Sequence, residues 1–339
     1  MVKKIAGLLI SALLLWLTLS KIQTGTPLLL PTLHQLPFIL ISILLSLFGF
    51  AIQAIRWSFF FEASAQNRLS KFLPSTLMGH FFNSILPFRM GEFIRPMHLS
   101  TKYKMNFLEV LPTCVADKFL DLVFIGFFAC LLMYKSIVEE LQHFTVITSA
   151  QNIAFACLTA FIVLALCIWF YSRRFTGPAL LKTISINIKN SLSALKPGSV
   201  KGGIGAIALL TVSLWFIILL GNYLLLYATG LPVQLISVKT ALYLTVFTTF
   251  AYAIPAAPSS IGTLNFAVVA ALEYLLHLQH QVITPELQNT IIVASGIFYV
   301  ASVLPDLISG VFLLFFERQF VAEIIRNKKL TANAPKSGI

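Results

Sequence analysis

The chain has 339 residues, of which 58% are hydrophobic and only 11% are charged, and its formal net charge is +12. A soluble domain carries about 25% charged residues, so this composition excludes a water-soluble protein and indicates an all-α integral membrane protein. The positive charge does not indicate nucleic acid binding, because lysine and arginine collect on the cytoplasmic side of membrane proteins.

Six apolar segments are long enough to form membrane-spanning helices, because such a helix needs about 20 apolar residues. The six segments are residues 5–21, 36–61, 110–134, 153–171, 203–228 and 289–316. The first of them follows two lysines as a secretory signal does. No small-residue cleavage site follows it, so we expect an uncleaved helix.

Two further regions, residues 72–100 and 235–276, contain apolar runs that polar residues interrupt. Each contains the pattern Pro-x-x-x-Gly, and the two patterns, Pro87–Gly91 and Pro258–Gly262, lie 171 residues apart. Broken apolar segments at corresponding positions of two halves point to the binding site of a transporter. We expect each region to form a pair of broken helices that either re-enters the membrane or crosses it twice.

The basic residues predict the orientation of these segments, because they mark the cytoplasmic side. With the N-terminus inside, the outer loops contain only Lys21, Lys135 and Lys239 among the basic residues, so both termini are expected in the cytoplasm. Each half, about 1–150 and 151–320, then holds three spanning helices and one broken pair. The second half is therefore expected to be inverted relative to the first. Chance overlap of apolar runs is the alternative.

A single polytopic membrane domain is expected over residues 1–320, and a largely disordered cytoplasmic tail over residues 321–339. Within the domain, residues 178–196 differ from the rest, since three lysines recur every seven residues beside an apolar stripe. This pattern predicts an amphipathic helix on the cytoplasmic leaflet. The alternative is a helix that packs on the bundle.

The first interruption carries three charged residues, Arg89, Glu92 and Arg95, at spacings of three. On a helix that starts near Phe88 they form one broad polar face, where Glu92 pairs with either arginine. Gly91 permits the close approach of another backbone segment. A helix start with two arginines favours phosphate, because free N–H groups and guanidinium groups both bind anions. The alternative is a cytoplasmic loop that only adds positive charge.

Three charged residues, Asp117, Lys118 and Asp121, open the next apolar segment. Asp117 and Asp121 share a helix face, and charges this close to a bilayer are costly unless they pair or line a wet cavity. We expect them to pair with Arg89 and Arg95. One alternative is a metal site, but no histidine or further carboxylate stands at ligand spacing. The other is an ion-pair network that only fixes helix packing.

The second interruption carries almost no charge. Its residues are Pro255, Pro258, Ser259, Ser260, Gly262, Thr263 and Asn265. Hydroxyl groups, an amide and free backbone groups can bind a polar headgroup or water. The alternative is a helix kink whose backbone groups are satisfied by neighbouring helices.

Other polar residues give weaker signals. Glu273 and Asp306 are carboxylates in apolar segments, and each is either a proton-coupling site or a paired core charge, of which we favour the second. His277 and His280 have the spacing of a zinc pair, but we expect solvated histidines. The sequence has no Ser/His/Asp order, nucleotide-binding loop or HExxH motif, so we expect no enzyme activity, no cofactor and no metal.

The stretch from Asn83 to Arg95 reads N-x-x-x-P-x-R-x-G-E-x-x-R. It resembles the flippase-like transmembrane domain of bacterial lysylphosphatidylglycerol synthases, including stand-alone members that lack the cytoplasmic aminoacyl transferase domain. The resemblance covers about residues 5–320. It includes a later basic residue and aspartate on one helix, and a break rich in proline before a late helix.

Two positions depart from the family pattern. Lys118 stands where arginine is expected, so bidentate pairing is not carried over to it. Asn265 stands where an acidic residue is common, so a charge at this place is not carried over either. No synthase domain follows Phe316, and the chain is therefore not expected to make an aminoacyl lipid by itself.

The resemblance implies a lipid flippase or lipid transporter in the cytoplasmic (inner) membrane of a bacterium or archaeon. The lipid would be a phospholipid, an aminoacyl phospholipid or a polyprenyl-phosphate-linked sugar. The residues expected around its headgroup are Asn83, Arg89, Glu92, Arg95, Asp117, Lys118 and Asp121.

The expected partners of such a protein are anionic membrane lipids and a lipid-modifying enzyme, and no nucleic acid. One alternative is a non-catalytic membrane subunit that presents lipid to a separate synthase or glycosyltransferase. A weaker alternative is a secondary transporter of small solutes.

Overall fold

The computed structural model describes residues 2–28, 30–61, 68–141, 203–254 and 257–318, which form helices joined by turns and loops, with no strand among them. With η for 3-10 helices, the elements are α1 (Val2–Leu19), α2 (Leu36–Ser58), α3 (Arg68–Ile85), η1 (Pro87–Arg89), α4 (Gly91–Tyr103), α5 (Phe107–Leu141), α8 (Gly203–Tyr227), η2 (Val233–Leu235), α9 (Val238–Ala253), η3 (Pro258–Ser260), α10 (Thr263–Leu278) and α11 (Pro285–Phe316). The predicted span at 153–171, the amphipathic helix at 178–196 and the tail at 321–339 lie outside the described residues.

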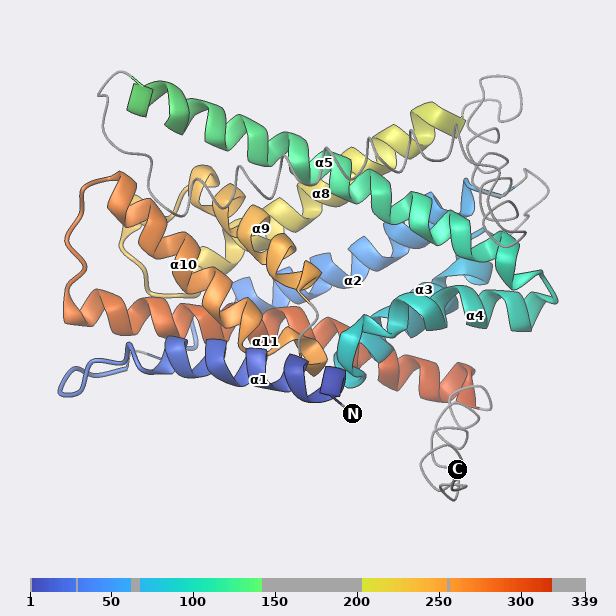
Figure 1. Ribbon diagram of the computed structural model, residues 1–339, viewed down its shortest axis with the longest axis horizontal. Helices are drawn as coiled ribbons and strands as arrows, with labels where there is room; N and C mark the ends of the chain where they lie inside the picture. Colours follow the sequence, from blue (N-terminus) through green and yellow to red (C-terminus); the bar gives the residue numbers. More distant parts are fainter. Residues whose placement is uncertain (1, 29, 62–67, 142–202, 255–256, 319–339) are drawn as a thin grey trace.

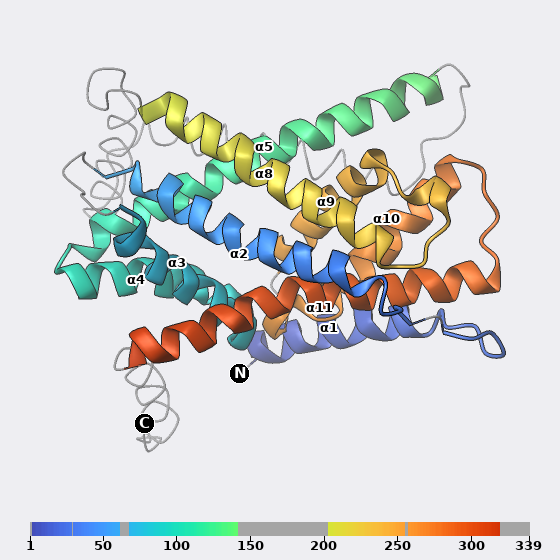
Figure 2. The same ribbon diagram turned by 180° about the vertical axis from the view of Figure 1, so that it is seen from behind.

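Two helical hairpins meet in the middle of the molecule. Helices α3 and α4 form one hairpin and α9 and α10 the other, and they enter from opposite ends of the long axis (Figures 1 and 2). Their turns, η1 and η3, contact each other. Around them, α2 packs against α8 and α11, α11 also packs against α3, and α1 lies on α10.

Four described segments are long and apolar enough to cross a membrane. They are Leu36–Ser58, Gly205–Tyr227, Pro258–Leu278 and Pro285–Phe315. The first, second and fourth agree with predicted spans, while the predicted spans 5–21 and 110–134 correspond to α1 and to part of α5. These helices confirm the expectation of an all-α membrane protein.

The outer surface of the bundle is apolar. On α2 the side chains of Leu40 and Leu44 are 60% and 63% exposed, and on α8 those of Leu209 and Phe216 are 67% and 63% exposed. Large apolar side chains in such numbers suit contact with lipid chains and do not suit water.

The largest buried cluster joins α8, α9, α10 and α11. Its fully buried members include Leu226, Leu244, Leu272 and Ile291, each with 0% exposure. These residues recur along each helix at spacings that bring one apolar stripe toward the neighbouring helices. This packing fixes the second hairpin against the wall formed by α8 and α11.

The two hairpin turns share an unusual backbone conformation. In η1, Phe88 and Arg89 have φ values of 61° and 52°, and in η3, Ser259 and Ser260 have φ values of 55° and 52°. L-residues other than glycine rarely occupy this left-handed region. In each turn the pair follows a proline, so the same local geometry occurs at the two places where the sequence is interrupted.

Each turn is also held by a glycine. A Cβ atom on Gly91 would lie 1.9 Å from the carbonyl oxygen of Gly79 on α3, so only glycine lets α4 approach α3 this closely. A Cβ atom on Gly262 would lie 2.3 Å from the carbonyl oxygen of Ser11 on α1. The close backbone approach predicted at Gly91 is confirmed.

Candidate functional site

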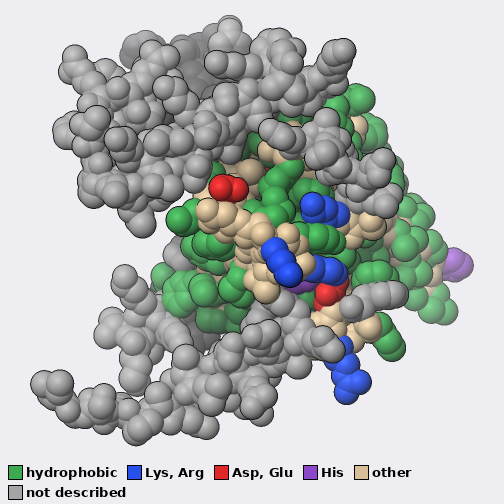
Figure 3. All heavy atoms as spheres, turned by 90° about the vertical axis from the view of Figure 1, so that its right-hand side faces the viewer, with side chains coloured by type: hydrophobic (Ala, Val, Ile, Leu, Met, Phe, Trp, Pro, Cys, Tyr) green, Lys and Arg blue, Asp and Glu red, His purple; other side chains and the backbone are tan. Residues whose placement is uncertain are grey.

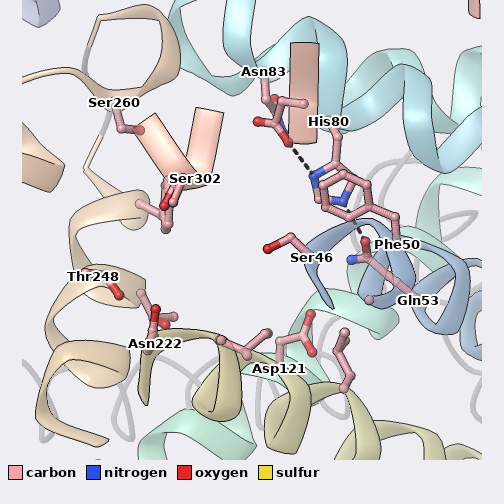
Figure 4. Close-up of a pocket in the computed structure, with 18 of the residues that line it drawn as sticks. Ser46, Phe50, Gln53, His80, Asn83, Asp121, Asn222, Thr248, Ser260 and Ser302 are labelled. Atoms are coloured by element: carbon pink, nitrogen blue, oxygen red, sulfur yellow. Dashed lines mark hydrogen bonds and ion pairs between the residues drawn. The ribbon is translucent and has the colours of Figure 1, made fainter. Parts of the chain in front are cut away.

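A cavity of ≈ 440 Å³ lies between the two hairpin turns and helices α2, α5, α8, α9 and α11 (Figure 4). Its walls combine apolar side chains such as Phe50, Leu122 and Trp215 with many polar ones. The polar lining residues are Ser42, Ser46, Gln53, His80, Asn83, Arg89, Lys118, Asp121, Asn222, Thr248, Thr249, Tyr252, Ser259, Ser260, Ser302 and Asp306. So many polar groups inside an apolar bundle favour a wet cavity that accepts a polar ligand.

Arg89 reaches the cavity from the first turn. Its Nη1 donates a hydrogen bond to the backbone oxygen of Tyr252 at 2.8 Å, and its guanidinium lies 5.3 Å from the centre of the Tyr252 ring. The sequence predicts Arg89 on a helix that starts near Phe88, and this is wrong. Helix α4 begins at Gly91, and Arg89 lies in the preceding left-handed turn because Pro87 starts a separate 3-10 segment.

Glu92 links the first hairpin to α5. Its Oε1 accepts a hydrogen bond from Asn83 Nδ2 at 3.2 Å and lies 3.2 Å from Lys118 Nζ. The guanidinium of Arg89 lies 3.7 Å from the same oxygen. One carboxylate therefore contacts two cations that line the cavity, Arg89 and Lys118, and one net positive charge is left.

A buried ion-pair network lies behind this wall. Arg56, with 0% exposure, donates from Nε to Asp117 Oδ1 at 2.8 Å and from Nη1 to Asp121 Oδ1 at 2.7 Å. Arg95 donates from Nη1 to Asp117 Oδ2 at 3.1 Å. The guanidinium of Arg95 lies on the ring of Trp57, 4.1 Å from its centre.

This network corrects the predicted pairing. Arg95 does pair with Asp117, but Asp121 pairs with Arg56, and Arg89 contacts neither aspartate among the contacts of the described residues. The sequence analysis missed Arg56, although an arginine inside the apolar segment 36–61 is the kind of signal that marks a paired or functional charge.

A second missed residue, His80, lies on α3 at the cavity wall. Its Nε2 lies 2.8 Å from Gln53 Oε1 (Figure 4). Its Nδ1 lies 3.5 Å from Asp306 Oδ1 on α11. Its ring stacks on Phe50 with 3.8 Å between centres. A lone histidine in an apolar helix gives little signal in one sequence, because its partners come from distant helices.

The second turn is held by hydrogen bonds that use most of its polar groups. Ser259 Oγ donates to the backbone oxygen of Ser84 at 2.8 Å, which joins the two hairpins. Asn265 Oδ1 accepts from the Gly262 N–H at 3.3 Å, and its Nδ2 donates to the backbone oxygen of Ser295 at 3.2 Å. Asn265 therefore fixes the start of α10 and does not line the cavity.

One known protein family matches most of the chain. A family model described as the lysylphosphatidylglycerol synthase TM region matches residues 4–284. The chain belongs to this family. No curated protein and no solved structure matches it.

The family match confirms the resemblance drawn from Asn83 to Arg95 and makes the chain a multi-pass membrane protein associated with lipid handling. The matched range contains both hairpins and the α2, α5 and α8 walls of the cavity. Helix α11, which supplies Ser302 and Asp306 to the cavity, follows the matched range.

In this member of the synthase TM family, the predicted site residues fall into three groups. Those that line the cavity are Asn83, Arg89, Lys118, Asp121, Ser259 and Ser260. Those that support it from behind are Glu92, Arg95 and Asp117, and those that shape the second turn are Pro258, Gly262 and Asn265. Pro255 lies outside the described residues.

The two remaining carboxylates of the apolar segments are both paired. Glu273 lies 2.5 Å from Lys21 Nζ and accepts a hydrogen bond from Gln288, while Asp306 faces His80. In the described part of the chain, no three histidine, cysteine or acidic residues are grouped as metal ligands. The cavity offers an anion two cations, Arg89 and Lys118, beside several hydroxyl groups.

Proposed function

We propose that this protein is a lipid flippase, or lipid transporter, which moves a phosphate-bearing polar lipid between the leaflets of the cytoplasmic membrane. The observation that carries the proposal is the polar cavity between the two hairpin turns, with Arg89 and Lys118 in its wall. The family, named for the membrane region of a phospholipid synthase, supports a lipid as the ligand. The lipid is a phospholipid, an aminoacyl phospholipid or a polyprenyl-phosphate-linked sugar.

The size of the cavity supports a ligand that enters only in part. A volume of ≈ 440 Å³ suits a headgroup or a small ligand and is too small for a lipid with its acyl chains. The apolar outer surface suits the acyl chains of the lipid, which stay in the bilayer while the headgroup crosses inside the polar cavity. The charged phosphate then does not have to pass through hydrocarbon, which would be costly.

The charges of the cavity favour Arg89 and Lys118 as the phosphate ligands. Both cations already contact the Glu92 carboxylate. A phosphate can replace this carboxylate beside the two cations, and the carboxylate displaces the phosphate when it returns. Arg95 has only 2% exposure and pairs with Asp117, so we assign it a positioning role. The same holds for Arg56.

We further propose that the two halves form an inverted repeat of the kind found in many secondary transporters. A shift of 171 residues brings η1 onto η3 and brings α2, α3, α4 and α5 close to α8, α9, α10 and α11. The opposite entry of the two hairpins supports one pair of broken helices in each half, placed in opposite orientations (Figures 1 and 2).

The basic residues at one end of the bundle support an orientation of the protein in the membrane. Lys and Arg side chains are visible at the end where α3 begins and α4 ends (Figure 3). Lys71 lies on α3 and Lys102 on α4, while Lys104 and Arg318 follow the ends of α4 and α11. We assign this end to the cytoplasm, together with both termini. The protein then acts without catalysis and takes its energy from a gradient or from a partner.

The experiment is the exchange of a fluorescent phosphatidylglycerol between the leaflets of vesicles that contain the purified protein. We expect exchange faster than in protein-free vesicles. Arg89→Ala and Lys118→Ala should each slow it about ten- to hundredfold, the effect of losing one hydrogen bond to a charged group. Lys102→Ala is the matched control, because Lys102 pairs with Glu317 away from the cavity.

Two results would decide against the proposal. Wild-type rates in both Arg89→Ala and Lys118→Ala would exclude the phosphate site. Lipid binding without exchange in the wild type would favour the alternative suggested by the family description, a membrane subunit that presents lipid to a separate synthase.

A further inference from the structure

The contact between His80 and Asp306 differs from the ion pairs in the described part of the chain. Every other paired carboxylate there has an arginine or lysine partner, whereas the ion pair of Asp306 is with a histidine alone. Both side chains line the cavity, with 25% and 20% exposure. The charge of this pair is therefore set by protons, and water in the cavity can deliver them.

The hydrogen bond between His80 and Gln53 sets which nitrogen of the imidazole ring carries a hydrogen. Gln53 Oε1 accepts at 2.8 Å from Nε2, so Nε2 carries a hydrogen. A neutral imidazole then has no hydrogen on Nδ1, the atom 3.5 Å from Asp306 Oδ1. An attractive contact needs one more proton, either on Nδ1 or on the carboxyl group. Without it, two lone pairs face each other.

The other charged groups around His80 each have a partner of opposite charge, and together they leave an excess of one positive charge. Glu92 on α4 pairs with Arg89 of η1 and Lys118 of α5, and Asp121 on α5 pairs with Arg56. The Tyr252 phenol on α9 also belongs to the cavity wall. One proton at His80 and Asp306 consequently changes the net charge of the cavity by +1, close to the two cations that face it.

We propose that His80 and Asp306 form the proton-binding site of this cavity, so that a proton binds together with a phosphodiester headgroup and leaves with it. The added positive charge favours the anion, and by linkage the anion favours the proton. The proton comes from water on the side where the headgroup enters, resides between Nδ1 and Oδ1, and returns to water on the other side.

The pair also joins two separate elements of the bundle. His80 belongs to the first hairpin and Asp306 to α11, and α3 and α11 are packed side by side. Proton loss removes an attraction between them, which favours their separation. This inference rests on the proposed function, because it names what drives transport through the same cavity.

The first test measures protons without transport. A short-chain phosphatidylglycerol is added to the purified protein in a weakly buffered detergent solution near neutral pH, with a pH indicator. We expect uptake of up to one proton per bound lipid in the wild type, and none in His80→Gln or Asp306→Asn. His277→Gln is the control, since His277 is exposed and lies outside the cavity. Equal uptake in wild type and His80→Gln would overturn the inference.

The second test imposes a gradient of one pH unit on vesicles that contain the protein. One proton per lipid shifts the steady-state leaflet ratio of the labelled lipid by up to tenfold. In His80→Gln the ratio should be the same with and without the gradient. Exchange that ignores the gradient in the wild type would refute this inference and leave the proposed function standing. Absence of lipid exchange in the wild type would refute the proposed function. The proton uptake measured in the first test would still show whether His80 and Asp306 bind a proton.

Discussion

Replacement of Arg56, the buried arginine of α2, tests whether the ion-pair network between α2 and α5 is present. Arg56 is fully buried and neutralises parts of two carboxylates, Asp117 and Asp121. In Arg56→Met, Asp117 keeps one bond from Arg95, and Asp121 loses its ion pair. Removing one partner of a buried pair costs about 3–5 kcal/mol, because a charge stays behind without compensation. We expect a loss of this size in the free energy of unfolding.

The assay is denaturation in mixed detergent micelles, followed by circular dichroism. The double variant Arg56→Met with Asp121→Asn should be more stable than Arg56→Met alone, with a coupling of about 0.5–3 kcal/mol. Lys21→Met is the control, because its pair with Glu273 is partly exposed and such pairs contribute about 1 kcal/mol or less. If Arg56→Met and Lys21→Met lower the free energy of unfolding by the same amount, the buried network of Arg56 is not present.

Two further variants test the hairpin and the cavity charge. Gly91→Ala places a Cβ atom 1.9 Å from the Gly79 oxygen and should destabilise the protein by about 1–3 kcal/mol or more. Gly126→Ala on α5 meets no atom within 4 Å among the described residues, so it should be neutral or stabilise the protein by up to about 1 kcal/mol. Equal stability of the two would contradict the close packing of α3 and α4. Glu92→Gln removes the carboxylate between Arg89 and Lys118 and should raise the amount of phosphate-bearing lipid that co-purifies, measured by mass spectrometry, about tenfold. Unchanged or reduced lipid would count against Glu92 as a competitor of the phosphate.

Much of the helical framework can be predicted from the sequence. Apolar runs longer than about 20 residues have no stable alternative to a helix in a membrane, so α2, α8 and α11 follow directly. The two hairpin turns are also predictable in position, because Pro87 and Pro258 interrupt apolar runs four residues before a glycine. The close backbone approach at Gly91 is predictable as well, but the structure is needed to identify α3 as the segment that approaches.

The pairing of the site residues is harder to predict. The left-handed backbone at Arg89 is not coded by its residue type, and it moves the side chain off the helix face on which the spacing places it. Arg56 and Asp121 lie 65 residues apart, so their contact depends on how α2 and α5 pack. The contact between His80 and Asp306 likewise needs the first hairpin to lie on α11. Spacing within one helix carries no information about such partners.

The central claim is that a lipid headgroup enters the cavity between the two turns. Its most direct test is photo-crosslinking with a phosphatidylglycerol that carries the reactive group on its headgroup, followed by peptide mapping. The account predicts crosslinks to cavity residues such as Gln53, Asn222 and Tyr252, which an excess of unlabelled phosphatidylglycerol suppresses. Crosslinks confined to the exposed outer faces of the helices, such as Leu40 and Leu44 on α2, would contradict it.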